Sequence, residues 1–297
     1  MNSIARPADA PRVGIIGAGT VGTALGVAIS RSGWPVTAFA SRDAGRRERF
    51  AALVPGARAY AEAPAILDAV ELIVVSVPDD AIAAVAGSMR LFAGQTMVHT
   101  SGLLGAGVLS ASLGAGSHIG AFHPLVSFTA DVERSVEGLK GATVAVEGDD
   151  DTVGLLADLA EAIGGLPVRL PAGSQAAYHA AAVLASGGLI ALLDAVVALG
   201  AVAGLDEPGA VAVYGRLMEQ TLANARAVGV AAALTGPITR GDAGTVTAHL
   251  EALARFAPEV ADLYLAAARR ELVIAEDRGT LAPDEAERVR SALAKVL

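Results

Sequence analysis

Three glycines near the start of the chain have the spacing of a phosphate-binding turn. Residues 17–22 read Gly-Ala-Gly-Thr-Val-Gly, directly after the apolar run Arg12–Ile16 and at the beginning of a helical pattern. In such a loop the first glycine permits a tight turn, the second lets the backbone approach a pyrophosphate, and the third allows helix and strand to pack closely. The phosphates of a dinucleotide would meet the positive end of the helix; a merely tight turn is the alternative. The residues expected to hold the dinucleotide are Gly17, Gly19, Thr20, Val21 and Gly22.

The end of the next predicted strand, Pro35–Ala40, indicates which dinucleotide binds. NAD-binding folds place an Asp or Glu at this tip to bind the ribose 2′-hydroxyl, whereas an Arg there accommodates a 2′-phosphate. The tip reads Ser41-Arg42, and the nearest carboxylate, Asp43, comes only after these two residues. We therefore predict NADP(H) as the cofactor, with Ser41 and Arg42 on the 2′-phosphate. The alternative is a solvated basic start of the following helix.

A third apolar run, Glu71–Val77, continues directly into Pro78. Ligands of open α/β sheets bind outside the carboxyl ends of the strands. We therefore expect Val77 and Pro78 to line the nicotinamide-ribose side of the site.

Histidines gather in a segment without charge, Leu91–Ala130, which contains His99, His118 and His123. The phrases His99–Gly102 and Phe122–Leu125 both follow apolar stretches, so we expect them at the same carboxyl edge of the sheet as the cofactor. An imidazole with a pKa near 6.5 can give or take a proton at neutral pH. The alternative for each histidine is a structural hydrogen bond. A metal site is not expected, because the histidines lack helical pairing and a nearby carboxylate.

Two phrases in the second half of the chain also carry polar groups that could do chemistry. Tyr178-His179 begins a long, otherwise apolar helical pattern, which indicates a buried hydrogen bond or a substrate contact. Residues 236–242 read Gly-Pro-Ile-Thr-Arg-Gly-Asp between two helical patterns. Arg240 could bind a substrate carboxylate through two hydrogen bonds, and Asp242 is expected to cap the following helix.

The elements that position these residues change in kind near residue 172. Before it, short apolar runs alternate with helical patterns, which indicates βαβ units and a mostly parallel, doubly wound sheet. After it, only helical patterns follow. We therefore predict an α/β dinucleotide-binding domain over residues 1–172 and an all-α domain for substrate binding and dimerisation over residues 173–297.

Composition excludes several classes of function for this chain of 297 residues. The formal charge of −9 provides no footprint for nucleic acid and none for an anionic membrane surface. The absence of cysteine excludes disulfides and thiolate metal sites. Residues 1–12 are polar and lack the apolar stretch of a secretory signal, so we expect the protein in the cytoplasm.

One segment has the composition of a membrane span. Leu170–Leu193 contains no Asp, Glu, Lys or Arg, but its first half holds Ser174, Gln175 and His179, and Asp194 follows at once. We expect a buried helix of a helical domain and no contact with a membrane.

Taken together, these phrases resemble a Rossmann-like family of unknown function. Its members are bacterial proteins usually assigned as NADP-dependent oxidoreductases, with a helical C-terminal domain of the 6-phosphogluconate dehydrogenase type. The resemblance covers nearly the whole chain, and residues 236–249 carry its most specific phrase. The matching phrases are Gly17–Gly22, His99–Gly102, Phe122–Phe128, Tyr178–Ser186 and Gly236–His249.

More distantly the chain is similar to pyrroline-carboxylate reductases, ketopantoate reductases and β-hydroxyacid dehydrogenases. Relatives of this kind often carry a catalytic Lys or Asn on the helix after the Rossmann domain. Here no lysine lies between Leu170 and Leu205. A histidine must then supply the proton, and His123 and His179 are the candidates.

The resulting hypothesis is an NADP-dependent oxidoreductase that acts on a small carbonyl, imine or hydroxy substrate between the two domains. Ser101 would hydrogen-bond the reacting atom and Arg240 would orient an anionic group. The rival is a non-catalytic NADP(H)-binding regulator or scaffold. Small-residue helices such as Ala180–Leu193 often pack against a second subunit in related folds, so the resemblance also implies a homodimer formed through the helical domain.

Overall fold

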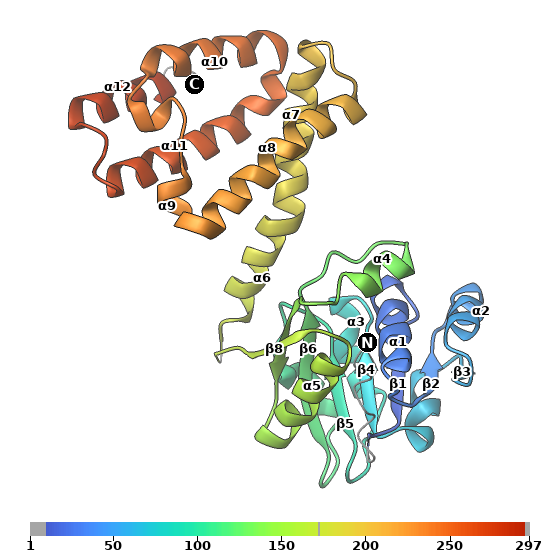
Figure 1. Ribbon diagram of the computed structural model, residues 1–297. Coiled ribbons are helices and arrows are strands. Elements are labelled where there is room, and N and C mark those ends of the chain that lie inside the picture. The colour runs from blue at the N-terminus through green and yellow to red at the C-terminus, as the bar shows by residue number, and fades with distance from the viewer. Residues whose placement is uncertain (1–9, 172, 295–297) are drawn as a thin grey trace. The chain divides into compact units, whose positions relative to one another are not determined.

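The computed structural model describes residues 10–171 and 173–294 and divides the chain into two compact units that meet between Val183 and Leu184. The first unit is an α/β sheet domain and the second is helical, as the change of sequence pattern predicted (Figure 1).

One sheet of eight strands forms the first unit, in the order β3-β2-β1-β4-β5-β6-β7-β8. Neighbouring strands run parallel except for β6 and β7, which are antiparallel. This is a doubly wound arrangement, in which the chain reverses its direction of travel across the sheet next to β1. The strands are β1 (Val13–Ile16), β2 (Val36–Ala40), β3 (Arg58–Tyr60), β4 (Leu72–Val75), β5 (Thr96–His99), β6 (His118–Pro124), β7 (Thr143–Glu147) and β8 (Leu166–Arg169).

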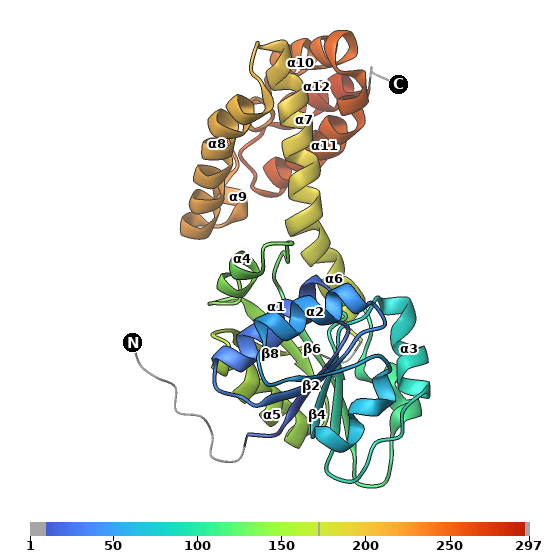
Figure 2. The ribbon, with the colours of Figure 1, turned by 90° about the vertical axis from the view of Figure 1, so that its right-hand side faces the viewer.

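Helices cover both faces of this sheet (Figure 2). Consecutive strand residues enter different cores: Ile15 belongs to the core that contains Leu25 and Leu156, and Ile16 belongs to the core that contains Ile82 and Leu109. Burial on both faces explains why the strands are almost continuously apolar. The helices of the first unit are α1 (Thr20–Arg31), α2 (Ala44–Leu53), α3 (Asp79–Gly87), α4 (Val132–Glu137), α5 (Asp150–Ala162) and α6 (Gln175–Val183), with 3₁₀ turns η1 (Ala63–Ala69) and η2 (Ala106–Ser112).

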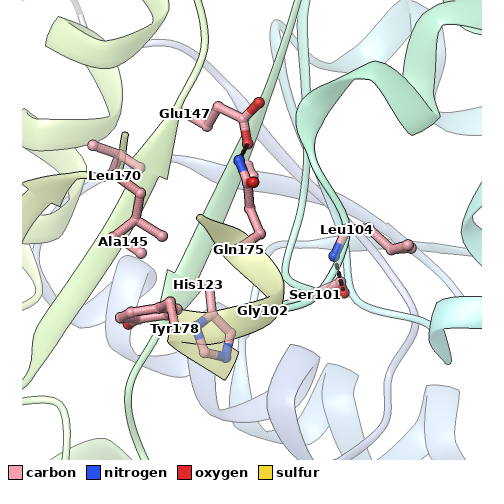
Figure 3. A pocket seen from close by; sticks show the side chains of 11 residues that line it. Ser101, Gly102, Leu104, His123, Ala145, Glu147, Leu170, Gln175 and Tyr178 are labelled. Atoms are coloured by element: carbon pink, nitrogen blue, oxygen red, sulfur yellow. Dashed lines mark hydrogen bonds between the residues drawn. The ribbon is translucent and has the colours of Figure 1, made fainter. Parts of the chain in front are cut away.

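The boundary between the units lies within a helix rather than at residue 172, where the sequence pattern changes. The first turns of α6 pack with the sheet, because the side-chain amide of Gln175 donates a hydrogen bond to Glu147 on β7 at 3.0 Å (Figure 3). The same turns bring Tyr178 and His179 to the ring of His123 on β6. These contacts assign α6 to the first unit.

The second unit builds its core from its last three long helices. Leu250, Leu272 and Val289 are almost fully buried against one another. The predicted N-cap Asp242 is confirmed, since it accepts a hydrogen bond from the amide of Thr245, and Asp206 caps the helix that follows it in the same way through the amide of Gly209. The elements are a π-helical turn η3 (Leu184–Gly188), α7 (Leu189–Val202), α8 (Glu207–Val228), α9 (Val230–Ala233), η4 (Ile238–Arg240), α10 (Ala243–Phe256), η5 (Pro258–Val260), α11 (Ala261–Asp277) and α12 (Pro283–Ala294).

The prediction of a buried helix over Leu170–Leu193 is wrong for the single chain. α6, η3 and α7 form one helix, Gln175–Val202, of which only 6% is buried in its most apolar window. By length and composition alone this helix could cross a membrane. The helix α8 packs on α7 but leaves much of the apolar surface of both helices exposed.

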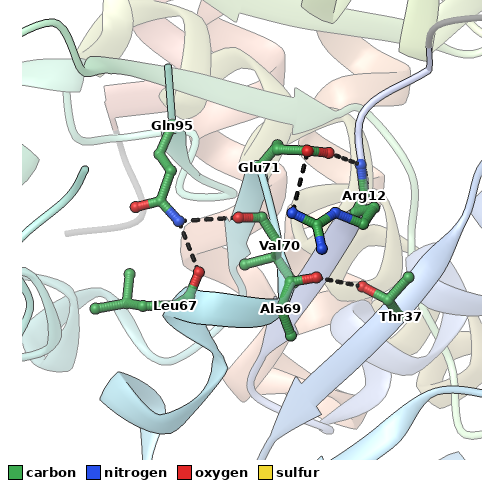
Figure 4. A network of polar contacts seen from close by, with 7 residues as sticks. All are labelled: Arg12, Thr37, Leu67, Ala69, Val70, Glu71 and Gln95. Atoms are coloured by element: carbon green, nitrogen blue, oxygen red, sulfur yellow. Dashed lines mark hydrogen bonds and ion pairs between the residues drawn. The ribbon is translucent and has the colours of Figure 1, made fainter. Parts of the chain in front are cut away.

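Gln95, at the amino end of β5, joins three backbone groups beneath the sheet (Figure 4). Its amide donates to the carbonyl oxygens of Leu67 and Val70 at 2.8 and 2.9 Å, and its oxygen accepts from the amide of Phe92 at 2.8 Å. The residue is 5% exposed. A single side chain therefore satisfies the polar groups of a turn that water cannot easily reach.

Replacing Gln95 by Leu should lower the free energy of unfolding of the first unit by about 2–3 kcal/mol, because the buried carbonyls and amide lose their partner. The measurement is urea unfolding followed by the fluorescence of Trp34, the only tryptophan, which is buried in the same unit.

The control is Glu71→Gln, which weakens the ion pair of Glu71 with Arg12 at 3.1 Å. This pair is half-exposed, so its loss should cost less than about 1 kcal/mol. Equal stability of the Gln95→Leu variant and the unmodified chain would contradict the structural role of Gln95.

Candidate functional site: a dinucleotide cradle beside a histidine cluster

The glycine loop has the geometry of a phosphate cradle. Gly17 has a φ of +101°, and a Cβ at this position would lie 2.1 Å from the carbonyl oxygen of Ser76. A Cβ on Gly22 would lie 1.9 Å from the carbonyl oxygen of Gly17. Only glycine therefore fits at the first and third positions of the loop. Above Gly19 the space is open, and the nearest atom to a Cβ would be Nη1 of Arg46 at 3.9 Å.

The amide end of α1 faces this open space without a side-chain cap. Gly19 is the N-cap, and no side chain bonds the first turn, to which Thr20 and Val21 belong, in the part of the chain that the structure describes. The first amides of a helix attract anions. A pyrophosphate therefore fits the loop by shape, by hydrogen-bonding capacity and by charge.

Arginine side chains lie at the tip of β2, and the nearby carboxylate of Asp43 is engaged in capping a helix. Asp43 accepts the amide of Arg46 at 2.8 Å and so caps α2. Arg47 donates to the backbone carbonyls of Ser41 and Arg42 at 2.6 and 3.0 Å, which fixes the tip. Arg42 is exposed there, and Arg46 reaches toward Gly19. These positions fit a 2′-phosphate.

Arg46 is a functional candidate that we did not predict. The available signal is its position in the first turn of the helix that follows the strand tip, where a side chain can reach back to the glycine loop. Val77 lies beside the same loop, with its Cγ1 3.1 Å from a Cβ built on Gly17, and Pro78 follows it as the N-cap of α3.

Histidines from two strands and one helix meet beyond this edge. His123 on β6 has its ring centre 5.9 Å from that of His179 and 5.7 Å from that of Tyr178. A Cβ on Gly102 would lie 2.7 Å from both imidazoles, so only glycine leaves the two rings room. The predicted pair is thus brought together within the first unit.

Register places a carboxylate in line with a third histidine. His99 on β5 pairs with Ala121 on β6, and Ala121 pairs with Glu147 on β7. Residues paired across a sheet point to the same face, so the small side chain of Ala121 separates His99 from Glu147. A small cavity lies here, lined by Gly102, Ala121, His123, Ala145, Glu147 and Tyr178 (Figure 3).

Burial determines the ionisation of these groups. It lowers the pKa of His123 to about 4, with a further lowering by His179, while Asp79 acts in the opposite direction. Burial also lowers the pKa of His99 and raises that of Tyr178. The expectation of an imidazole near pKa 6.5 is therefore wrong for His123, which is neutral at pH 7.

Several ring nitrogens of the cluster lack hydrogen-bond partners. In the described residues both nitrogens of His99, Nδ1 of His123, Nδ1 of His179 and the hydroxyl of Tyr178 are buried without one. His99 is fully buried, and although the backbone of Gly105 lies near its ring, no bond of normal length and angle forms. Buried polar groups without partners are costly unless they serve another purpose.

The hydroxyl of Ser101 is fully engaged. It donates to Oδ2 of Asp79 at 2.7 Å and accepts from the amides of Leu103 and Leu104 at 3.1 Å. A contact of Ser101 with a substrate would require the loss of one of these bonds. As it stands, Ser101 holds the loop after β5 and orients Asp79.

The remaining histidine of the uncharged segment lies elsewhere. His118 is at the amino end of β6, where its Nδ1 lies 2.7 Å from Oδ2 of Asp149. This carboxylate also caps α5 through the amide of Thr152. The structural alternative therefore holds for His118.

The second unit holds Arg240 at the end of η4. The glycine after it is required by structure, because Gly241 has a φ of +66° and a Cβ there would lie 2.5 Å from Cβ of Glu285. Asp242 caps α10 and also accepts from the hydroxyl of Thr245 at 2.6 Å. The role of Arg240 on a substrate carboxylate stays a prediction.

Strand order, glycine loop and uncapped helix together define a dinucleotide-binding α/β domain followed by a helical domain. Residues 2–124 match the family model of the Rossmann-like domain, and residues 142–271 match that of a domain of unknown function, DUF2520. The chain thus carries a Rossmann-like domain followed by a DUF2520 domain, which confirms the resemblance seen in the sequence. No functionally curated protein matches the chain.

Solved structures with the same fold cover nearly the whole chain. A suspected NADP oxidoreductase from Bacteroides fragilis, BF3122, is 23% identical over 88% of this chain and 97% of its own, with a TM-score of 0.74. Protein TM1727 from Thermotoga maritima is 25% identical over 90% and 99%, with a TM-score of 0.66. A pyrroline carboxylate reductase from Plasmodium falciparum with NADP bound is 11% identical over 96% and 98%, with a TM-score of 0.61.

The ring of His123 should titrate near pH 4 in imidazole NMR spectra, and His179→Asn should raise its pKa, because one neighbouring positive charge is removed. The unfolded chain binds this proton near pH 6.5. Stability from this group is therefore complete above pH 6.5 and is lost as the pH falls toward 4.

The His123→Asn variant assigns the resonance, and His249→Asn in the second unit serves as the control that should leave the His123 titration unchanged. A midpoint near 6.5 for His123 in the unmodified chain would show that its burial is overstated.

Proposed function

We propose that the protein is an NADP-dependent oxidoreductase that acts on a small carbonyl, imine or hydroxy substrate. The observation that carries this proposal is the continuity of the edge. The open space at Gly19, the cations at the tip of β2 and the half-buried His123 all lie at the carboxyl ends of strands, and His179 of α6 packs on His123 there. The names of the B. fragilis and P. falciparum structures support the cofactor, and the fold alone does not determine the substrate.

Each part of the edge has its own task in this proposal. The amides of α1 and the glycine loop hold the pyrophosphate, and Ser41, Arg42 and Arg46 hold the 2′-phosphate. The bound nicotinamide supplies the redox chemistry. Val77 and Pro78 border its ribose. His123, whose pKa burial lowers, and His179 beside it accept a proton or an N–H or O–H group of the substrate. Arg240 binds an anionic group of the substrate.

NADPH should bind more tightly than NADH, and Arg42→Ala should weaken NADPH about tenfold or more with little effect on NADH. One charge-assisted hydrogen bond contributes roughly 1.5–3 kcal/mol, and 1.4 kcal/mol is tenfold in affinity. Arg46→Ala should act in the same direction. The measurement is energy transfer from Trp34 to the nicotinamide, because Trp34 lies at the opposite end of β2 from Ser41 and does not touch the site.

Arg49→Ala is the matched control, because Arg49 is an exposed cation of the same helix. Equal binding of both dinucleotides would remove the NADP assignment and keep the fold. If neither dinucleotide binds, the glycine loop is structural and the oxidoreductase proposal falls.

We further propose that a second copy of the chain covers the apolar surface of the second unit. In the described part of the chain, eleven of the nineteen exposed large apolar side chains lie between Leu184 and Val230, including Leu184 at 73% and Leu217 at 62% exposure. Such a surface marks an interface. A lipid interior would have to accommodate Asp194 and the exposed Arg216–Glu219 pair, whereas a partner surface leaves these charges at its rim.

Light scattering should give the mass of a dimer, and Leu217→Glu and Ile190→Glu should each give a monomer. Val273→Glu is the control, because Val273 is an exposed apolar residue of α11 outside this surface. A monomeric mass for the unmodified chain would refute the homodimer.

A further inference from the structure

The charges that surround the histidine cluster are negative. The negative charge of Asp79 attracts a proton to His99 and to His123, and the charge of Glu147 does the same for His99. The wall between them comes from residues 91–130, which carry no charge. In the described residues, the side chains that act electrostatically on these two rings are therefore two carboxylates and other histidines. A cation would be attracted to this place, and an anion would be repelled.

The same space is rich in hydrogen-bond acceptors. His99 is fully buried with two unpartnered ring nitrogens, and His123 and His179 each bury an unpartnered Nδ1. Glu147 lines the cavity beside Gln175, to which only one of its oxygens is bonded. A neutral imidazole has one nitrogen free to accept. The cluster therefore offers acceptors to a ligand that brings N–H donors.

We propose that the substrate of this site is an iminium ion, the protonated form of an imine, and that Glu147 and Asp79 select it over an uncharged carbonyl compound. This inference rests on the proposed function, which left the substrate open among carbonyl, imine and hydroxy compounds.

Reduction of a ketone and reduction of an iminium ion differ in whether the protein must supply a proton. Reduction of a ketone leaves an alkoxide, so the protein must donate a proton. An iminium ion already carries its proton: when reduced NADPH adds hydride to carbon, the C=N π pair becomes the lone pair of the nitrogen, and a neutral amine and NADP⁺ result. No proton from the chain is needed. A neutral His123 has no acidic proton to transfer at pH 7, so it suits the second reaction.

Tyr178 is the group that could favour the carbonyl reaction instead, because its buried hydroxyl can donate a hydrogen bond to a carbonyl oxygen. Burial raises the pKa of this phenol, which makes proton transfer from it less favourable at neutral pH. An iminium substrate therefore requires the carboxylate of Glu147 for turnover, whereas a carbonyl substrate requires the hydroxyl of Tyr178.

The first test uses pyrrolidine, which is cationic at neutral pH, and tetrahydrofuran, its uncharged ring analogue. With NADP⁺ present, pyrrolidine should shift the imidazole NMR signals of His123 and His179, and tetrahydrofuran should bind more weakly. Glu147→Gln and Asp79→Asn should each weaken pyrrolidine about fivefold or more, as loss of one partly screened charge pair implies. Both substitutions keep an oxygen that can accept the bonds of Gln175 and Ser101.

Asp80→Asn is the matched control, because Asp80 follows Asp79 on α3 and is equally exposed, whereas Asp79 is the carboxylate that Ser101 bonds and that acts on His99 and His123. It removes the same charge next to the site and should leave pyrrolidine binding unchanged. Equal binding of the two probes, no binding of pyrrolidine, or unchanged binding in Glu147→Gln would overturn the proposal.

The second test measures NADPH consumption with 1-pyrroline and with cyclopentanone. We expect turnover with 1-pyrroline only and a fall in kcat/KM in Glu147→Gln. Turnover of cyclopentanone that depends on Tyr178 would overturn the inference and leave the oxidoreductase proposal standing. Failure of NADPH itself to bind would instead refute the proposed function, and that result comes from the separate Trp34 titration.

Discussion

The hydrogen bond between Gln175 and Glu147 holds the rest of the site in place. Gln175 is the first residue of α6, and residues three and four positions later lie on the same face of a helix. The bond therefore sets the rotation of α6 such that Tyr178 and His179 reach His123. It also fixes the carboxylate of Glu147 above the backbone of Gly105, with an oxygen 3.4 Å from a Cβ built there. One contact joins strand, loop and helix.

Burial, and not a charged partner, sets the pKa values of His99 and His123 in this site. His99 and His123 sit among small and apolar residues, and their nearest charges, Asp79 and Glu147, do not form ion pairs with them. Desolvation then outweighs the attraction of the carboxylates and keeps the rings neutral. A site built in this way keeps unsatisfied acceptors in a buried place at a cost in stability, which is typical of functional sites rather than of cores.

Much of the fold could be predicted from local sequence, because most strands are apolar runs bounded by turns. Two strands, β3 and β6, lack this signal. β3 is a three-residue, partly exposed edge strand, and β6 reads His-Ile-Gly-Ala-Phe-His-Pro, with little β-branched character. Pairing on both sides with β5 and β7 imposes the strand on β6. Tertiary pairing of this kind overrides local preference.

The sequence predicts local geometry where one short segment holds all the residues concerned, as in the tight turn of the glycine loop, and it does not predict contacts that depend on the register of the strands. Nothing near Glu147 in the sequence points to His99, because only the pairing of both residues with Ala121 brings them into line. Asp79 is a similar case, since its bond to Ser101 crosses from α3 to the loop after β5. The lowered pKa of His123 follows from burial, which the sequence does not state.

The most specific phrase of the sequence, residues 236–242, shows that a distinctive motif and a functional site need not coincide. Gly241 is there because the turn needs a left-handed backbone and because Glu285 of α12 leaves no room for a side chain. Asp242 is there because α10 needs a cap. Two of the seven residues thus have a complete structural explanation. Arg240 is exposed, and its charge helps to lower the pKa of Asp242, so this residue too has a local effect at the start of α10.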